Sequence, residues 1–216
     1  MPVRGRVGHL APGGRRARRA RRGRSAGADH RRPRDGLLGV LDLGDDRQPR
    51  VAVGRRHAVV VLGHRAHALL VIGGGDGGTV RELLRYEQLE EVTLVEIDEL
   101  VIEACKLHLP ETAVAFDNPR LNLLVEDGIK YIKECENERY DLIIVDSADP
   151  VGPGEGLFTA EFYSEVYRCL SKDGIMITQS ESPRFNSAVF VEIYDTYKQI
   201  FGAEKVHCYL AAIPTY

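Results

Sequence analysis

Apolar residues gather in short runs separated by amphipathic stretches from Ala68 to the end of the chain. Unbroken apolar runs are typical of strands buried on both faces of a parallel sheet, whereas apolar residues at helical spacing indicate amphipathic helices. The runs predict six strands, which are in chain order 69–72, 92–96, 121–125, 142–145, a strand from residue 175, and 206–213. Strands that alternate with helices predict an α/β fold in which helices flank a parallel sheet.

The segments between these runs predict the helices and their ends. Apolar spacing indicates a helix after residue 78 and others over 99–109, 129–134 and 187–201. Thr159 has a hydroxyl suited to cap a further helix that presents Phe162 and Val166 on one side. The sequence Lys172-Asp173-Gly174 predicts a turn into the fifth strand.

Residues 1–67 differ in composition from residues 68–216. The first segment holds 17 Arg, 5 Asp and neither Lys nor Glu, a charge of +12, whereas the second holds 6 Arg, 6 Lys and 27 acidic residues, a charge of −15. The first segment also lacks Phe, Tyr, Trp and Ile, so it has little with which to build a core. We therefore expect two parts: an Arg-rich segment 1–67, and a folded catalytic domain 68–216.

Several interpretations of residues 1–67 stay open. The segment has the composition of a disordered solvated tail, a basic arm for nucleic acid, a nuclear address, an organelle transit peptide, or GC-rich DNA read in a shifted frame. Apolar residues within 37–62 also predict short strands.

The acidic domain has no electrostatic reason to bind nucleic acid or an anionic membrane, but it would attract a small cationic substrate. The four cysteines are far apart and form no C-x-x-C pair, which favours a reduced, cytoplasmic chain with no structural metal; they are Cys105, Cys135, Cys169 and Cys208. No apolar run approaches the ~20 residues that a membrane span requires.

A glycine-rich loop follows the first strand. Gly73, Gly75 and Gly78 form a G-x-G-x-x-G pattern between a strand and a helix, which allows close approach of a nucleoside, although a turn without a ligand is the alternative. Asp76 lies inside this loop, and its carboxylate would repel the pyrophosphate of a dinucleotide. A cationic sulfonium cofactor meets no such repulsion.

Further carboxylates follow the other strands. Glu96 ends the second strand, where it can accept hydrogen bonds from ribose hydroxyls, and Asp127-Gly128 follows the third, either at an adenine or ribose edge or as a plain turn. Asp146 and Asp149 follow the fourth strand. Together with Asp76 they would form an anionic site, whose mutual repulsion a bound diamine relieves.

These motifs, in this order and spacing, resemble spermidine synthases of the polyamine aminopropyltransferase family. The matching stretches are Val71–Gly78, Val95–Asp98, Glu126–Gly128, Asp146–Pro150 with Gly152-Pro153, and Ile213–Tyr216, so the resemblance covers residues 68–216 nearly continuously. It implies a Rossmann-like sheet of the class I methyltransferase type. Such relatives begin with a β-rich segment that residues 1–67 do not resemble, and they continue past Tyr216 into a final strand, which we expect to be missing here.

The resemblance also implies the reaction, a step of spermidine biosynthesis. A transferase would move the aminopropyl group of decarboxylated S-adenosylmethionine to putrescine or a similar diamine, giving spermidine and methylthioadenosine, with no metal and with a homodimer as one assembly. Asp146 would accept the proton. The expected cofactor-binding residues are Gly73, Gly75, Glu96, Asp127, Gly128 and Pro153, and the expected substrate-binding residues are Asp76, Asp149, Tyr216 and Gln179.

Two alternatives remain at this point. One is an amine methyltransferase that uses S-adenosylmethionine itself; its cofactor would bring a carboxylate toward Asp76, which disfavours it. The other is an inactive fragment of the same fold, because the segments that precede and follow the motifs in relatives are not recognisable here.

Overall fold

The computed structural model describes residues 50–53, 66–147, 152–179 and 186–208. The chain divides into two compact units, Met1–Asp35 and Gly36–Tyr216, and every described residue belongs to the second. Within these ranges no helix is both long and apolar enough to cross a membrane.

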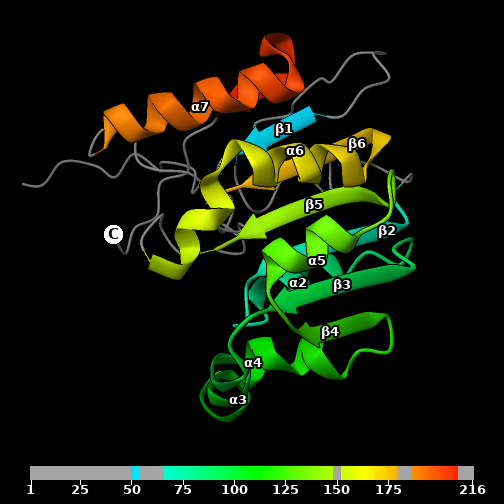
Figure 1. Ribbon diagram of the computed structural model, residues 1–216. Helices are drawn as coiled ribbons and strands as arrows, with labels where there is room; N and C mark the ends of the chain where they lie inside the picture. The colour runs from blue at the N-terminus through cyan, green and yellow to red at the C-terminus, as the bar shows by residue number, and fades with distance from the viewer. Residues whose placement is uncertain (1–49, 54–65, 148–151, 180–185, 209–216) are drawn as a thin grey trace, which may run out of the picture. The chain divides into compact units, whose positions relative to one another are not determined.

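Seven strands of the described chain form one sheet in the order β4-β3-β2-β5-β6-β1-β7, and the paired strands run parallel (Figure 1). The predicted parallel α/β fold is therefore confirmed. Because the strands run the same way, their carboxyl ends lie at one edge of the sheet, where open α/β folds bind ligands. The strands are β1 (Arg50–Val53), β2 (Ala68–Gly73), β3 (Glu91–Glu96), β4 (Leu121–Val125), β5 (Tyr140–Asp146), β6 (Leu170–Thr178) and β7 (Val206–Cys208).

The start of β6 differs from the prediction. The strand begins at Leu170, so Lys172-Asp173-Gly174 lies inside it and is not a turn before it. The register against β5 shifts between the pairs Tyr140↔Leu170 and Leu142↔Ile175, which means that the extra residues of β6 bulge out of the ladder. A bulge and a turn share the same Asp-Gly signal, which explains the wrong prediction.

β1 lies in the segment 1–67 and confirms that a short strand forms within residues 37–62. It pairs with two strands at once: Val51 is opposite Met176 of β6 and Val206 of β7. β7 confirms the start of the strand predicted over 206–213. Residues 209–216 lie outside the described ranges, so the rest of that strand stays a prediction.

The helices cover both faces of the sheet, with α5, α6 and α7 on one face and α2 on the other (Figure 1). The Thr159 side chain accepts a hydrogen bond from Phe162 N at 3.2 Å, which confirms the predicted cap of α6. The helices are α2 (Gly78–Leu83), α3 (Glu99–His108), α4 (Pro110–Ala113), α5 (Gly128–Glu134), α6 (Ala160–Cys169) and α7 (Ser187–Phe201), with 3-10 segments η2 (Val114–Asp117), η3 (Gly152–Phe158) and η4 (Ala203–Lys205).

Alternate residues of each central strand enter two separate cores. In β2, Leu69 and Val71 pack with the α2 side, whereas Leu70 and Ile72 pack with the side of α5, α6 and α7. All four side chains are at most 2% exposed, and burial of each contributes about 1.5–3 kcal/mol. The central strands are therefore fixed on both faces, and they present their carboxyl ends as a rigid platform.

Candidate active site

The glycine loop joins β2 to α2 in a conformation that only glycine adopts readily. Gly73, Gly74 and Gly77 have φ angles of 78°, 74° and 77°, and the N–H of Gly77 closes the turn on the carbonyl of Gly74 at 3.0 Å. Gly78 is the first residue of α2. The G-x-G-x-x-G pattern thus occupies the strand, turn and helix as expected.

The loop packs directly against Asp146, the last residue of β5. Gly73 is opposite Asp146 in the β2–β5 register, and a Cβ on Gly73 would lie 2.3 Å from the Asp146 carbonyl oxygen. The Asp146 side chain is nearly buried, and Thr79 Oγ1 donates to its Oδ2 at 2.7 Å. Thr79 was absent from the predicted site because no local pattern relates it to a residue so far along the chain.

The same loop holds Glu96, the last residue of β3. Glu96 is buried; its Oε2 accepts the N–H of Gly75 at 3.0 Å and its Oε1 accepts the N–H of Asp98 at 3.1 Å. A Cβ on Gly75 would lie 2.7 Å from Glu96 Oε2, so the loop approaches this carboxylate as closely as glycine permits. An ionised carboxylate has about four acceptor positions, which leaves capacity for ribose hydroxyls.

Two further predicted acids each accept a hydrogen bond from the backbone N–H two residues later in the chain. Asp76 is exposed, and its Oδ1 accepts the N–H of Gly78 at 3.1 Å. Asp127 caps α5, with Oδ1 accepting the N–H of Ile129 at 2.8 Å. The Asp127 side chain therefore has a structural role whether or not it also contacts a ligand.

Gly128 allows the start of α5 to lie against β2. A Cβ at this position would be 2.4 Å from Cγ2 of Ile72, which is buried. This contact brings the Asp127-Gly128 turn next to the strand that leads into the glycine loop.

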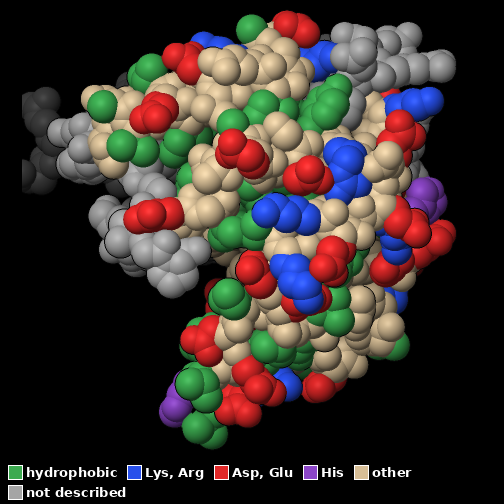
Figure 2. All heavy atoms as spheres, viewed as in Figure 1, with side chains coloured by type: hydrophobic (Ala, Val, Ile, Leu, Met, Phe, Trp, Pro, Cys, Tyr) green, Lys and Arg blue, Asp and Glu red, His purple; other side chains and the backbone are tan. Residues whose placement is uncertain are grey.

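The thiol of Cys105, in α3, is influenced by the charges of two of the predicted site acids. Burial raises the pKa of the Cys105 thiol, and the negative charges of Asp76 and Glu96 raise it further. Sequence reasoning had treated this cysteine only as evidence for a reduced chain. The surface over α3 and α4 carries acidic side chains beside exposed apolar ones such as Leu100 and Leu107 (Figure 2).

The other predicted residues have the following positions. Gln179 is exposed directly after β6, and its N–H donates to the carbonyl of Val145, the neighbour of Asp146, at 3.4 Å. Pro153 lies in η3. Asp149 and Tyr216 lie outside the described residues.

In the part of the chain that the structure describes, no three His, Cys, Asp or Glu side chains gather in a way that could hold a metal ion.

Comparison with known proteins identifies relatives of this arrangement. The family described as "Spermine/spermidine synthase domain" matches residues 56–216. The chain is 49% identical over 161 residues to a polyamine aminopropyltransferase of Clostridium botulinum (strain Alaska E43 / Type E3), which covers 74% of this chain and 56% of that protein. It is also 49% identical over 162 residues to the polyamine aminopropyltransferase of Alkaliphilus oremlandii, with coverages of 74% and 56%. The chain thus spans about half the length of the curated relatives that it matches.

Solved structures agree with these matches. A crystal structure of spermidine synthase in complex with the transition state analogue AdoDATO has a TM-score of 0.60 and 40% identity, over 62% of this chain and 46% of that one. The spermidine synthase of Thermotoga maritima has a TM-score of 0.56 and 37% identity, over 62% and 44%. The predicted Rossmann-like sheet of the class I methyltransferase type is therefore confirmed.

Proposed function

Because this chain belongs to the spermine/spermidine synthase family, we propose that it transfers the aminopropyl group of decarboxylated S-adenosylmethionine to putrescine or a similar diamine. The products are spermidine and methylthioadenosine. The observation that carries the proposal is that one glycine loop packs against two buried carboxylates, those of Glu96 and Asp146, while it contributes a third at Asp76. Both the sulfonium donor and the ammonium acceptor are cations that such a site favours.

In this proposal the cofactor lies along the carboxyl ends of β2, β3 and β4. Gly73 and Gly75 have no side chains, so the cofactor can approach the backbone of the loop closely. Glu96 accepts hydrogen bonds from the ribose hydroxyls. Asp127 and Gly128, at the start of α5, lie at the nucleoside edge, and Pro153 of η3 is assigned to the same ligand.

The diamine is assigned to the remaining predicted residues. Asp76 and Asp149 attract its ammonium groups, and Tyr216 and Gln179 complete the expected contacts. A primary ammonium has a pKa near 10.4, so exposing its lone pair at pH 7 costs about 4.6 kcal/mol. Asp146 directs and accepts the proton while the amine nitrogen forms a bond to the aminopropyl carbon, and the carbon–sulfur bond breaks to leave neutral methylthioadenosine.

Calorimetric titration distinguishes this function from amine methylation. Purified chain is titrated with decarboxylated S-adenosylmethionine and with S-adenosylmethionine, each with and without putrescine. Tighter binding of the decarboxylated form, strengthened by putrescine and weakened in Asp76→Ala, supports aminopropyl transfer. Preference for S-adenosylmethionine would instead indicate a methyltransferase, and no binding by a folded sample would indicate an inactive fragment.

A matched control separates a specific carboxylate from net charge. Asp173→Ala removes the same side chain at an exposed position near the start of β6, at the opposite edge of the sheet. We expect its calorimetric titrations to equal those of the unmodified chain.

Turnover, assembly and location are tested separately. Mass spectrometric detection of spermidine and methylthioadenosine in equal amounts tests turnover. Sedimentation of the same sample tests the proposed homodimer, and cell fractionation tests the proposed cytoplasmic location.

A further inference from the structure

We propose that Thr79 is a positioning residue that fixes the orientation of the Asp146 carboxylate, so that the glycine loop serves the proton acceptor as well as the cofactor. The catalytic effect of this positioning rests on the proposed function. The hydrogen bond that underlies it does not depend on that function.

The contact is short and has a defined direction. Thr79 Oγ1 lies 2.7 Å from Asp146 Oδ2, within the range of an O–H group that donates to an ionised oxygen. Both side chains are shielded from solvent, since Asp146 is only 7% exposed and Thr79 is partly buried. Because the bond holds one carboxylate oxygen, it restrains rotation of the group and so contributes to the direction in which the other oxygen points.

The loop that leads to Thr79 is itself tightly packed on two sides. On one side, a Cβ on Gly74 would lie 3.2 Å from Asp146 Oδ2. On the other side, a Cβ on Gly77 would lie 2.9 Å from the Thr112 carbonyl and 3.1 Å from the Phe116 ring. The loop is therefore packed between β5 and the segment formed by α4 and η2.

The residue after Thr79 anchors the helix. Val80 is 0% exposed and belongs to the core on the α2 face. Its branched Cβ leaves the Thr79 side chain two preferred rotamers in a helix, and the observed one places the hydroxyl against Asp146. The anchored helix and this contact together suit the positioning of a proton acceptor.

Kinetics of Thr79→Val and Thr79→Ser test the catalytic role. Valine keeps the shape but removes the donor, so we expect kcat to fall roughly tenfold to a hundredfold while the dissociation constant of decarboxylated S-adenosylmethionine stays within about twofold. Serine restores the hydroxyl and should recover most of kcat. Thr196→Val is the matched control: its hydroxyl donates to the Glu192 carbonyl at 2.9 Å on the exposed side of α7, and its loss should leave kcat unchanged.

A second readout needs no turnover. In protein labelled with ¹³C at aspartate carboxyl carbons, loss of the hydrogen bond should move the carboxyl resonance of Asp146 in Thr79→Val at fixed pH, and Thr79→Ser should restore its position. An unmoved Asp146 resonance in the valine variant would overturn the proposal, and so would unchanged kcat in an active chain. If the unmodified chain binds cofactor but makes no spermidine, the proposed function fails while this resonance still decides whether Thr79 holds Asp146.

Discussion

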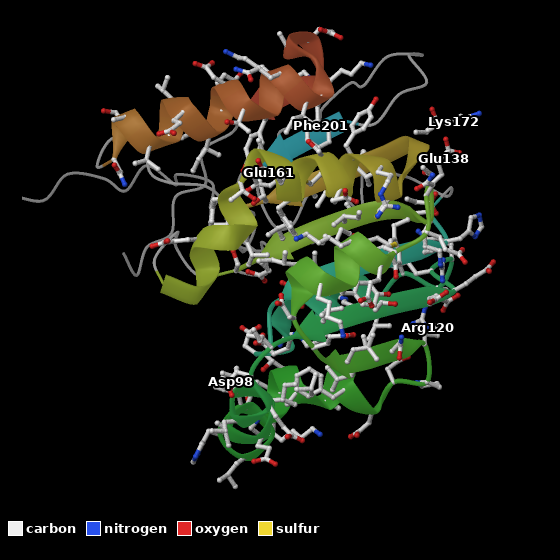
Figure 3. All side chains as sticks on the ribbon, in the orientation of Figure 1. Asp98, Arg120, Glu138, Glu161, Lys172 and Phe201 are labelled. Atoms are coloured by element: carbon white, nitrogen blue, oxygen red, sulfur yellow. The ribbon has the colours of Figure 1, made fainter. Side chains whose placement is uncertain are left out.

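Glu91 and Glu96, at the two ends of β3, are held by different kinds of donor. Where β3 begins, Glu91 pairs with Arg139, and the neighbouring Glu90 lies 3.2 Å from His67. Where the strands end, the observed donors to Glu96 are the backbone N–H groups of Gly75 and Asp98. Figure 3 shows the two edges, with Arg120, Glu138 and Lys172 at the starts of strands and Asp98 at the other side.

This difference separates stabilisation from function. An ion pair orients a carboxylate and also cancels its charge, whereas a neutral donor orients it and leaves its charge in place. Oriented, uncancelled negative charge is costly for an empty domain, but it favours a cationic ligand. Glu96 is therefore held by neutral donors, which suits the proposed cation site, whereas Glu91 is held by a cation, which suits a role in stability.

The largest effect is expected at the proton acceptor. Asp146→Asn keeps size and burial but removes the charge, so kcat should fall about 10²- to 10⁴-fold while cofactor still binds. Rapid-quench assay of product together with calorimetry of cofactor binding measures both quantities. Activity near that of the unmodified chain would mean that Asp146 stabilises the fold and does not accept the proton.

The next effect is expected at Gly75, whose φ is not positive, so that alanine adds bulk without backbone strain. The added Cβ would displace Glu96 from its place 2.7 Å away. We expect the dissociation constant of decarboxylated S-adenosylmethionine to rise roughly tenfold to a hundredfold, with a smaller loss of stability because the buried carboxylate is displaced from the Gly75 N–H. Loss of stability without loss of affinity would contradict the distinction between the two edges.

A smaller effect, on stability alone, is expected at the opposite edge. Arg139→Gln removes the partner of Glu91 from a pair whose side chains are 35% and 42% exposed. Such pairs contribute about 0.2–1 kcal/mol, so urea denaturation should show a decrease of that size. Cofactor affinity measured on the same variant should not change, and a change would show that the edges are coupled.

The smallest effect concerns the thiol of Cys105. The charges of Asp76 and Glu96 add to burial in raising its pKa, so the reactive thiolate is scarce near pH 8 and alkylation by iodoacetamide should be slow. In Asp76→Asn one of these charges is gone, the thiol pKa falls, and the alkylation rate should rise by a few-fold at the same pH. Mass spectrometry of the modified peptide against time measures the rate, with exposed Cys208 as the internal reference.

Local patterns were sufficient to predict the central strands and most helices. Unbroken apolar runs marked β2, β3 and β5, and the Thr159 hydroxyl marked the start of α6, because period, capping and burial all depend on neighbouring residues. The positions of Gly73, Gly75 and Glu96 followed from the spacing between a strand, a loop and the next strand.

Contacts between distant residues could not be predicted in this way. The bond from Thr79 to Asp146 depends on the loop conformation and on the β2–β5 register, neither of which leaves a local signal. The short helix α4, which packs near the loop, begins at a proline, and the sequence pattern there is too short for a helical period. The position of β1 depends on partners from two other parts of the chain.

That position of β1 has a consequence for synthesis on the ribosome. β1 emerges early, yet the strands on either side of it, β6 and β7, are completed only after residues 178 and 208 have been added. Until β7 is made, β1 has one side without its neighbour, and an exposed strand edge readily pairs with another chain. Slow translation through α7 would prolong this interval, so the yield of folded protein should depend on how quickly the chain passes from β6 to β7.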